Sequence, residues 1–92
     1  MIDLATEKET LAKADRDVAE GERRVAQQAE LIEHMRSRGS PHDVTAAEGL
    51  LRTLQETLQS WRDHRATIIR TIADMEAGRL PGGPASEPAN PL

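Results

Sequence analysis

The feature that most constrains this chain is the spacing of apolar side chains between residues 45 and 78. Successive members of the series are alternately four and three residues apart, and all but one are apolar. An average step of about 3.5 residues keeps one stripe of a long helix turned toward a partner helix. The spacing predicts a coiled-coil seam on a helix over residues 45–78. The seam positions are Ala47, Leu51, Leu54, Leu58, Trp61, Arg65, Ile68, Ile72 and Met75.

A second series with the same alternation predicts the partner helix over residues 3–37. Its start is open to two interpretations: Thr6 has capping-box spacing to Glu9, and Asp3 gives an earlier start, which we prefer. This seam is smaller and more polar, because Glu7, Gly21 and Gln28 stand where leucine is expected. Its positions are Leu4, Glu7, Leu11, Ala14, Val18, Gly21, Val25, Gln28, Ile32 and Met35.

Residues 38–44 are expected to form the connection between the two helices. Gly39 is suited to end the first helix, and Pro41 cannot continue it. Thr45 has capping-box spacing to Glu48, and Asp43 is a competing cap for the second helix. Because a short connection returns a helix beside its predecessor, we expect an all-α fold over residues 1–78, an antiparallel two-helix coiled-coil hairpin.

Composition favours this narrow architecture over a globular one. Hydrophobic residues make up 37% of the 92 residues, and Trp61 is the single aromatic residue. Such a chain can line a helical seam but cannot fill a broad core. There is no cysteine, and no apolar run approaches the roughly 20 residues of a membrane span. We therefore expect no membrane association, and the absence of signal-peptide features makes the cytoplasm the expected location.

The composition changes after Gly78. Four of the five prolines and two of the six glycines fall in residues 79–92, which are therefore expected to be a disordered tail. Spaced prolines also suit a recognition peptide, although a frayed terminus is the favoured interpretation.

Three large aliphatic residues lie beside the two seams rather than on them: Leu31, Leu50 and Ile69. They widen the apolar faces beyond what two helices need, so we expect them to form an outer interface. A homodimer that completes a four-helix bundle, or docking on another helical protein, would cover it. A row of small residues repeats every seven positions beside the first seam, which suits either close packing or helix propensity. The row is Ala5, Ala12, Ala19 and Ala26.

The stretches DVAEGERRVAQQAELI at 17–32 and PHDVTAAEGLL at 41–51 resemble short, uncharacterised proteins of rhizobia and related alphaproteobacteria. Those proteins carry an Ala-Glu-Gly-Glu-Arg segment on one helix and a His-Asp, Ala-x-x-Leu-Leu start on the next. The resemblance covers roughly residues 14–72, and Trp61 and the long tail depart from it. It implies a bacterial helical hairpin, with no catalytic residues to carry over.

Sites for chemistry are not expected. His64 is about 30 Å along its helix by helical rise, too far to join His34 and His42, and a closed zinc site needs four ligands. The carboxylates fall on exposed helix faces without a pocket to shift their pKa values. We therefore expect no catalytic residue, metal ion, cofactor or small-molecule substrate.

Two function classes remain. The first is a non-enzymatic interaction or self-assembly module, such as a small bacterial regulatory or signalling adaptor. The alternative is a small helical-hairpin regulator that binds nucleic acid. The formal net charge of −4 argues against nucleic acid, although a local basic patch could form from either of two arginine groups. The groups are Arg16, Arg23 and Arg24, and Arg62, Arg65 and Arg70.

Overall fold

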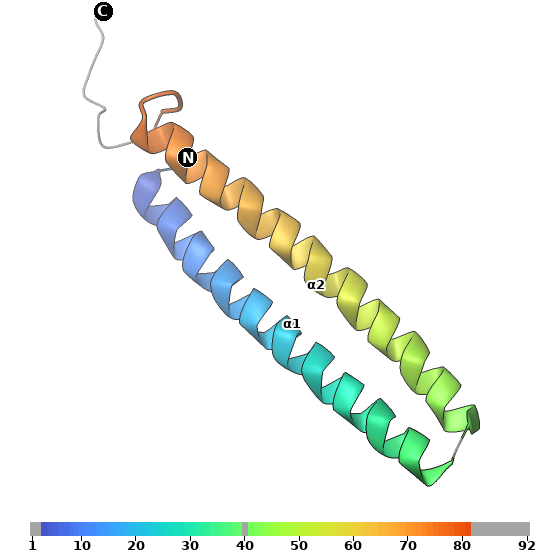
Figure 1. Cartoon of the computed structure of the whole chain (residues 1–92). Coiled ribbons are helices and arrows are strands. Elements are labelled where there is room, and N and C mark those ends of the chain that lie inside the picture. The colour runs from blue at the N-terminus through green and yellow to red at the C-terminus, as the bar shows by residue number, and fades with distance from the viewer. Residues whose placement is uncertain (1–2, 40, 82–92) are drawn as a thin grey trace, which may run out of the picture. The chain divides into compact units, whose positions relative to one another are not determined.

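The computed structural model describes residues 3–39 and 41–81, without the side chains of residues 41–43. In that part of the chain there are two α-helices and no strands: α1 spans Leu4–Arg38 and α2 spans Pro41–Glu76. The two helices pack against each other (Figure 1). The predicted all-α class is confirmed.

Asp3 caps the first turn of α1. The backbone N–H of Thr6 donates to Asp3 Oδ1 at 2.7 Å, and the N–H of Glu7 donates to the Asp3 carbonyl at 3.0 Å. The carboxylate thus satisfies an N–H that has no partner within the helix. The hydrogen bond from Thr6 also holds the pKa of the Asp3 carboxyl below its ordinary value. Of the two predicted starts, Asp3 is correct and Thr6 lies inside the helix.

The predicted connection over residues 38–44 is wrong. Helix α1 continues through Arg38 and α2 already begins at Pro41, so the connection is much shorter than expected. Gly39 supports the early turn with a φ of +73°, a conformation that favours glycine. Proline suits the first helical position, because its φ is already helical and its missing N–H would have no acceptor there. Asp43 and Thr45 consequently lie within α2, and neither is its cap.

A glycine cap ends α2 at Glu76, two residues before the predicted Gly78. Gly78 has a φ of +79° and donates to the carbonyl of Met75, while the N–H of Arg79 donates to the carbonyl of Asp74 at 2.7 Å. This pair of bonds is the Schellman pattern. Residues 79–81, the first three of the predicted disordered tail, form bends and a turn beyond the helix end. The remainder of that prediction, over residues 82–92, lies outside the described residues.

The chain divides into two compact units. The first unit comprises Met1–Asp15 with Asp63–Leu92, and the second is Arg16–Arg62. In the first unit, a buried cluster joins α1 to α2, and its members are Ala14, Ile68 and Ile72, with Leu4 and Leu11 packed against them. Met75, also in this unit, is fully buried. The core of the first unit therefore consists of aliphatic seam residues alone.

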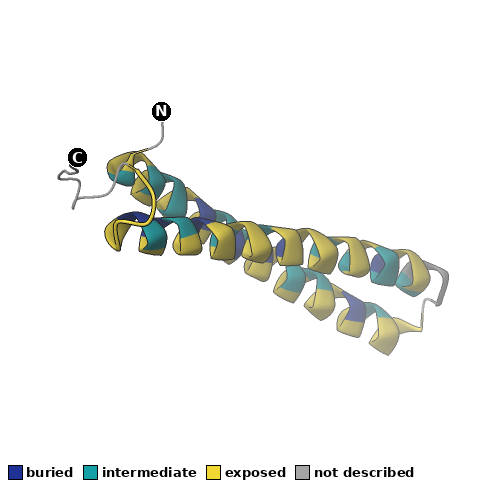
Figure 2. Ribbon diagram, turned by 90° about the horizontal axis from the view of Figure 1, so that it is seen from above, coloured by how far each residue is buried: buried dark blue, intermediate teal, exposed yellow. Residues whose placement is uncertain are grey.

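In the second unit, the buried residues also come from both helices. They are Val18, Gly21 and Ile32 of α1 with Ala47 and Leu58 of α2. Buried and half-buried residues follow one side of each helix, whereas the other sides are exposed (Figure 2). A single stripe on each helix thus supplies the burial, as a coiled-coil seam requires.

Candidate interaction surfaces

Every predicted seam residue is buried or half-buried, so the alternation of fours and threes locates the inward stripe of both helices. The buried members are Ala14, Val18, Gly21, Ile32, Ala47, Leu58, Ile68, Ile72 and Met75. The half-buried members are Leu4, Glu7, Leu11, Val25, Gln28, Met35, Leu51, Leu54, Trp61 and Arg65. The unusual members of the seam each have a specific neighbour.

Gly21 makes room for two large residues of α2. A Cβ atom at this position would lie 3.0 Å from Leu58 Cδ1 and 3.2 Å from two ring carbons of Trp61. Both distances are shorter than ordinary van der Waals contact, so alanine would require a neighbour to move. Gly21 therefore faces Leu58 and Trp61 of α2.

Gln28 has a backbone partner on the facing helix. Its Nε2 donates to the carbonyl of Ala47 at 2.9 Å, and the side chain is half-buried. The bond satisfies a polar group that would otherwise weaken the seam. Sequence spacing placed Gln28 on the seam but could not identify this acceptor, because the acceptor depends on the offset between the helices.

Arg65 is the one charged residue on the seam of α2. Its Nε donates to Asp15 Oδ1 at 2.6 Å, and both side chains are about half exposed. The stem therefore covers apolar surface while the guanidinium stays at the edge. An exposed pair of this kind contributes about 0–1 kcal/mol, so the contact with Asp15 affects pairing more than stability.

Further ion pairs join the two helices at the edge of the seam. In the first unit, Lys8 Nζ lies 3.3 Å from Glu76 Oε2. In the second unit, Arg62 Nη2 donates to Glu22 Oε2 at 3.0 Å. Arg36 pairs with Glu48 in the same unit. All of these side chains are substantially exposed, so solvent screens them and their individual contributions are small.

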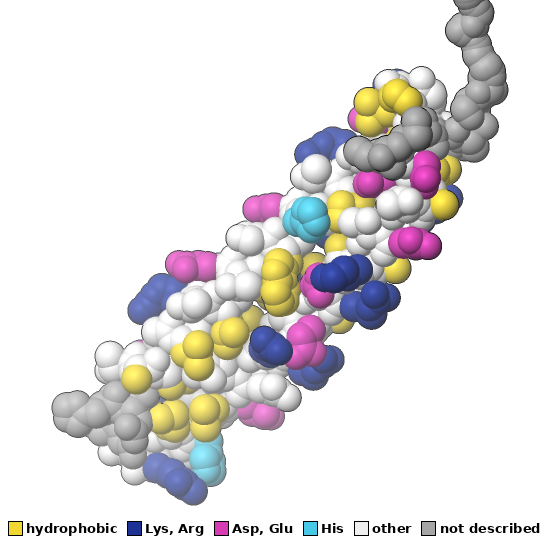
Figure 3. All heavy atoms as spheres, turned by 180° about the vertical axis from the view of Figure 1, so that it is seen from behind, with side chains coloured by type: hydrophobic (Ala, Val, Ile, Leu, Met, Phe, Trp, Pro, Cys, Tyr) yellow, Lys and Arg dark blue, Asp and Glu magenta, His cyan; other side chains and the backbone are white. Residues whose placement is uncertain are grey.

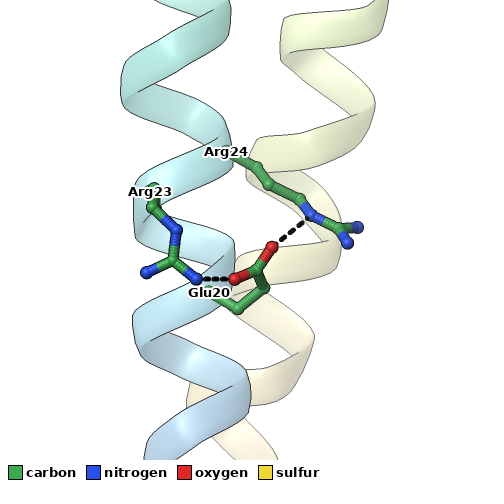
Figure 4. A network of polar contacts seen from close by, with 3 residues as sticks. All are labelled: Glu20, Arg23 and Arg24. Carbon is green, nitrogen blue, oxygen red and sulfur yellow. Dashed lines mark hydrogen bonds and ion pairs between the residues drawn. The ribbon is translucent and has the colours of Figure 1, made fainter.

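Glu20 holds two arginines of α1 at once. Its carboxylate pairs with Arg23 through one oxygen and accepts a hydrogen bond from Arg24 Nε at 2.8 Å through the other (Figure 4). One of the two arginine groups considered as a basic patch is thus partly neutralised. The other contains Arg62 and Arg65, which pair with acids of α1. Acidic and basic side chains alternate over the face shown in Figure 3.

The three predicted outer residues are exposed. Leu31 and Leu50, in the second unit, are 48% and 50% exposed, and Ile69, in the first unit, is 44% exposed. Leu31 borders a shallow depression on α1 together with Gln27, Glu30 and His34. These aliphatic side chains are available to a partner.

The alanine row, Ala5, Ala12, Ala19 and Ala26, is also exposed. It is therefore not part of the buried contact between α1 and α2, which favours helix propensity or an external partner as its role.

The histidines do not assemble a site within the described residues. His34 and His64 are exposed, and the side chain of His42 lies outside the description. Over the described residues, no group of three or more histidine, aspartate or glutamate side chains is placed to hold a metal ion. Neither described helix has a stretch long and apolar enough to cross a membrane.

Comparison with known proteins adds no family to this picture. No family model matches the chain, and neither the curated proteins nor the solved structures provide a match. The resemblance to short alphaproteobacterial proteins therefore stays a prediction.

Proposed function

We propose that this chain is a non-enzymatic interaction module, an antiparallel coiled-coil hairpin that self-associates into a four-helix bundle. The order of contacts within each unit supports the antiparallel arrangement. In the first unit, Lys8 contacts Glu76 and the later Asp15 contacts the earlier Arg65. In the second unit, Glu22 contacts Arg62 and Arg36 contacts Glu48, so the order is again reversed.

The exposure of Leu31 and Leu50 is the observation that carries the proposal. Covering the exposed half of one leucine contributes roughly 1 kcal/mol. A twofold axis uses the same patch twice, so the two leucines of each copy together contribute about 4 kcal/mol per dimer. Association costs at least about that much. Covering the leucines therefore only offsets the cost of association, so a stable dimer also needs polar contacts around them.

Light scattering coupled to size exclusion at micromolar concentration tests the proposal. A self-associating module elutes with twice the 10.1 kDa mass of one chain and shifts toward monomer on dilution. A fully helical monomer at all concentrations would contradict self-association, and a docking partner of another sequence would then be the remaining form of the proposal.

The salt dependence of binding to nucleic acid distinguishes a nucleic-acid regulator from an interaction module. Phosphate binding by arginines weakens steeply as salt rises, because counterions are released on binding. We expect no such binding to duplex DNA or RNA, since Arg23, Arg24 and Arg62 are offset by nearby acids. Tight, strongly salt-dependent binding would overturn this expectation.

A further inference from the structure

We propose that the second copy docks on an outward stripe of α1 and that two copies of this stripe pack antiparallel about a twofold axis. The proposal rests on the self-association proposed above and names the surface that performs it. The outward stripe lies wholly within the second unit and consists of Glu20, Arg24, Gln27, Leu31, His34 and Arg38.

The outward stripe has the spacing of a second seam. Its members alternate four and three residues apart, so they follow one line on α1 beside the inward seam. Glu20 is half-buried and the other members are exposed. Leu31, the stripe's large aliphatic residue, borders the shallow depression with Gln27 and His34. A second helix laid along this line would cover Leu31 without disturbing the hairpin.

The two edges of the second unit differ. Leu31 and Leu50 each directly precede a seam residue, whereas Glu22 and Glu48 each directly follow one. In a 3.5-residue repeat, these positions fall on opposite sides of the seam. The edge that holds Glu22 and Glu48 is already bridged by the pairs with Arg62 and Arg36. The edge with the two exposed leucines is the one open to a second copy.

On this open edge, the line that continues from Leu50 along α2 carries no charged residue within the second unit. Thr53 and Thr57 continue the line from Leu50 by steps of three and four, and both are exposed. The hydroxyl of Thr53 donates to the carbonyl of Gly49 within its own helix. Thr53 therefore needs no polar partner from outside, and its methyl group can contact a neighbour.

Charge complementarity identifies the occupant as a second copy in antiparallel orientation. Arg23 and Glu30 are exposed on α1 next to the stripe and lie seven residues, or two turns, apart. A twofold axis at the level of Ala26 and Gln27 places Arg23 of each copy opposite Glu30 of the other. A parallel pair would instead place the two Arg23 side chains on opposite edges of the contact, where neither meets Glu30.

The ion pair within α1 does not prevent this exchange. Arg23 already contacts Glu20, but the Arg23 side chain is substantially exposed. A surface pair of this kind is worth about 0–1 kcal/mol. Arg23 can therefore turn to the Glu30 carboxylate of the other copy at little cost.

Charge reversal with complementation tests the surface. R23E leaves acids at positions 23 and 30 of one copy, and E30R leaves bases at both. Each variant alone should raise the dissociation constant of its homodimer roughly tenfold, because two attractive contacts become two repulsive ones. An equimolar mixture of R23E and E30R should dimerise within about threefold of the wild-type constant, since every cross-contact is again attractive.

Two further variants complete the experiment. E33R is the matched control, because Glu33 is exposed on α1 but lies off the outward stripe, and it should leave dimerisation unchanged. L31E should abolish the dimer while circular dichroism shows that helicity is retained, because it buries a charge at the contact.

The possible outcomes distinguish a failure of the proposed surface from a failure of self-association itself. A wild-type protein that is monomeric in light scattering would overturn both. A wild-type dimer that R23E, E30R and L31E leave intact would overturn this surface alone. Single variants that weaken the dimer without rescue in the mixture would show that Arg23 and Glu30 do not face each other across the axis.

Discussion

Gly21 occupies a position on the seam of α1 where a missing side chain matters more than helix propensity. Glycine costs about 1 kcal/mol relative to alanine inside a helix. At Gly21, a Cβ would meet Leu58 at 3.0 Å and the Trp61 ring at 3.2 Å. The two effects oppose each other at a single residue, so a substitution there can separate them.

We expect Gly21→Ala to leave the melting temperature unchanged or to lower it, and to alter Trp61 fluorescence. The gain in helix propensity is offset because the Trp61 ring or Leu58 must shift to admit the methyl group. Thermal unfolding followed by circular dichroism, with the tryptophan emission spectrum, measures both effects.

Gly49→Ala is the matched control, because a Cβ at Gly49 meets no atom within 4 Å. It should stabilise the protein by about 1 kcal/mol and leave the Trp61 spectrum as it is. If Gly21→Ala behaves in the same way as Gly49→Ala, the space-making role of Gly21 is wrong.

At the scale of the helices, the start of α1 and the end of α2 are each held by a well-defined cap. Asp3 holds the start of α1 through the N–H of Thr6, and Gly78 with Arg79 closes α2 on the carbonyls of Met75 and Asp74. Capping bonds act locally, so their loss frays the first or last turn before it unfolds the packed helices.

We predict that the first turn of α1 frays in acid. The pKa of Asp3 is lowered in the folded protein by the hydrogen bond from Thr6, so ionised Asp3 favours folding. That stabilisation is fully present above the ordinary value of 3.8 and is lost as the pH falls through the lower folded pKa. Hydrogen exchange of the Thr6 amide, measured against pH, should show its protection decline in this range.

Asp3→Asn removes the titration while retaining an oxygen that accepts the hydrogen bond. In this variant, the protection of the Thr6 amide should no longer depend on the ionisation of residue 3. An identical acid transition in the variant and the wild type would assign the effect to another carboxylate.

At the other end of the molecule, we expect truncation to separate the cap of α2 from the tail. Removing residues 82–92 should leave the melting temperature within about 1 °C. Removing residues 79–92 should cost about 0.5–1 kcal/mol, because Arg79 and Leu80 donate to the Asp74 carbonyl and the Arg79 side chain pairs with the Asp74 carboxylate. Differential scanning calorimetry of the two truncated chains measures the difference. Equal melting temperatures would show that the cap at the end of α2 does not contribute measurably to stability.

Hydrophobic spacing located the inward stripe of both helices from sequence, because burial on one side of a helix follows directly from a repeat of about 3.5 residues. The connection was predicted too long, because Asp43 and Thr45 carry capping signals, whereas α2 begins at Pro41. The bond from Gln28 to Ala47 could not be predicted either, because helical periodicity fixes a face but not the offset between two helices. The exposure of Leu31 followed from its place beside the seam, whereas its neighbours in the shallow depression became evident only in three dimensions.

At the scale of the whole molecule, the burial is too narrow to make a hairpin strongly stable by itself. No charged or polar side chain is buried among the described residues, and Met75 alone is fully buried among the large side chains there. Ordering a residue costs about 1.5 kcal/mol of conformational entropy, which seam burial in so small a chain barely offsets. Folding and self-association are therefore expected to be coupled.

Coupled folding predicts a melting temperature that rises with protein concentration. For a dimer that unfolds to two separate chains, a tenfold increase in concentration adds about 1.4 kcal/mol to the apparent stability. For about 150 to 200 residues unfolding together, this corresponds to roughly 3–5 °C per tenfold change. Thermal melts followed by circular dichroism at 1, 10 and 100 μM test the prediction. These concentrations cover about two decades and include a micromolar dissociation constant.

L31E is the control, because a monomeric variant should melt at a lower temperature that does not change with concentration. A wild-type melting temperature that is equally independent of concentration would show that a second copy adds nothing to the stability of the folded chain, and the exposed leucines would then contribute nothing to it.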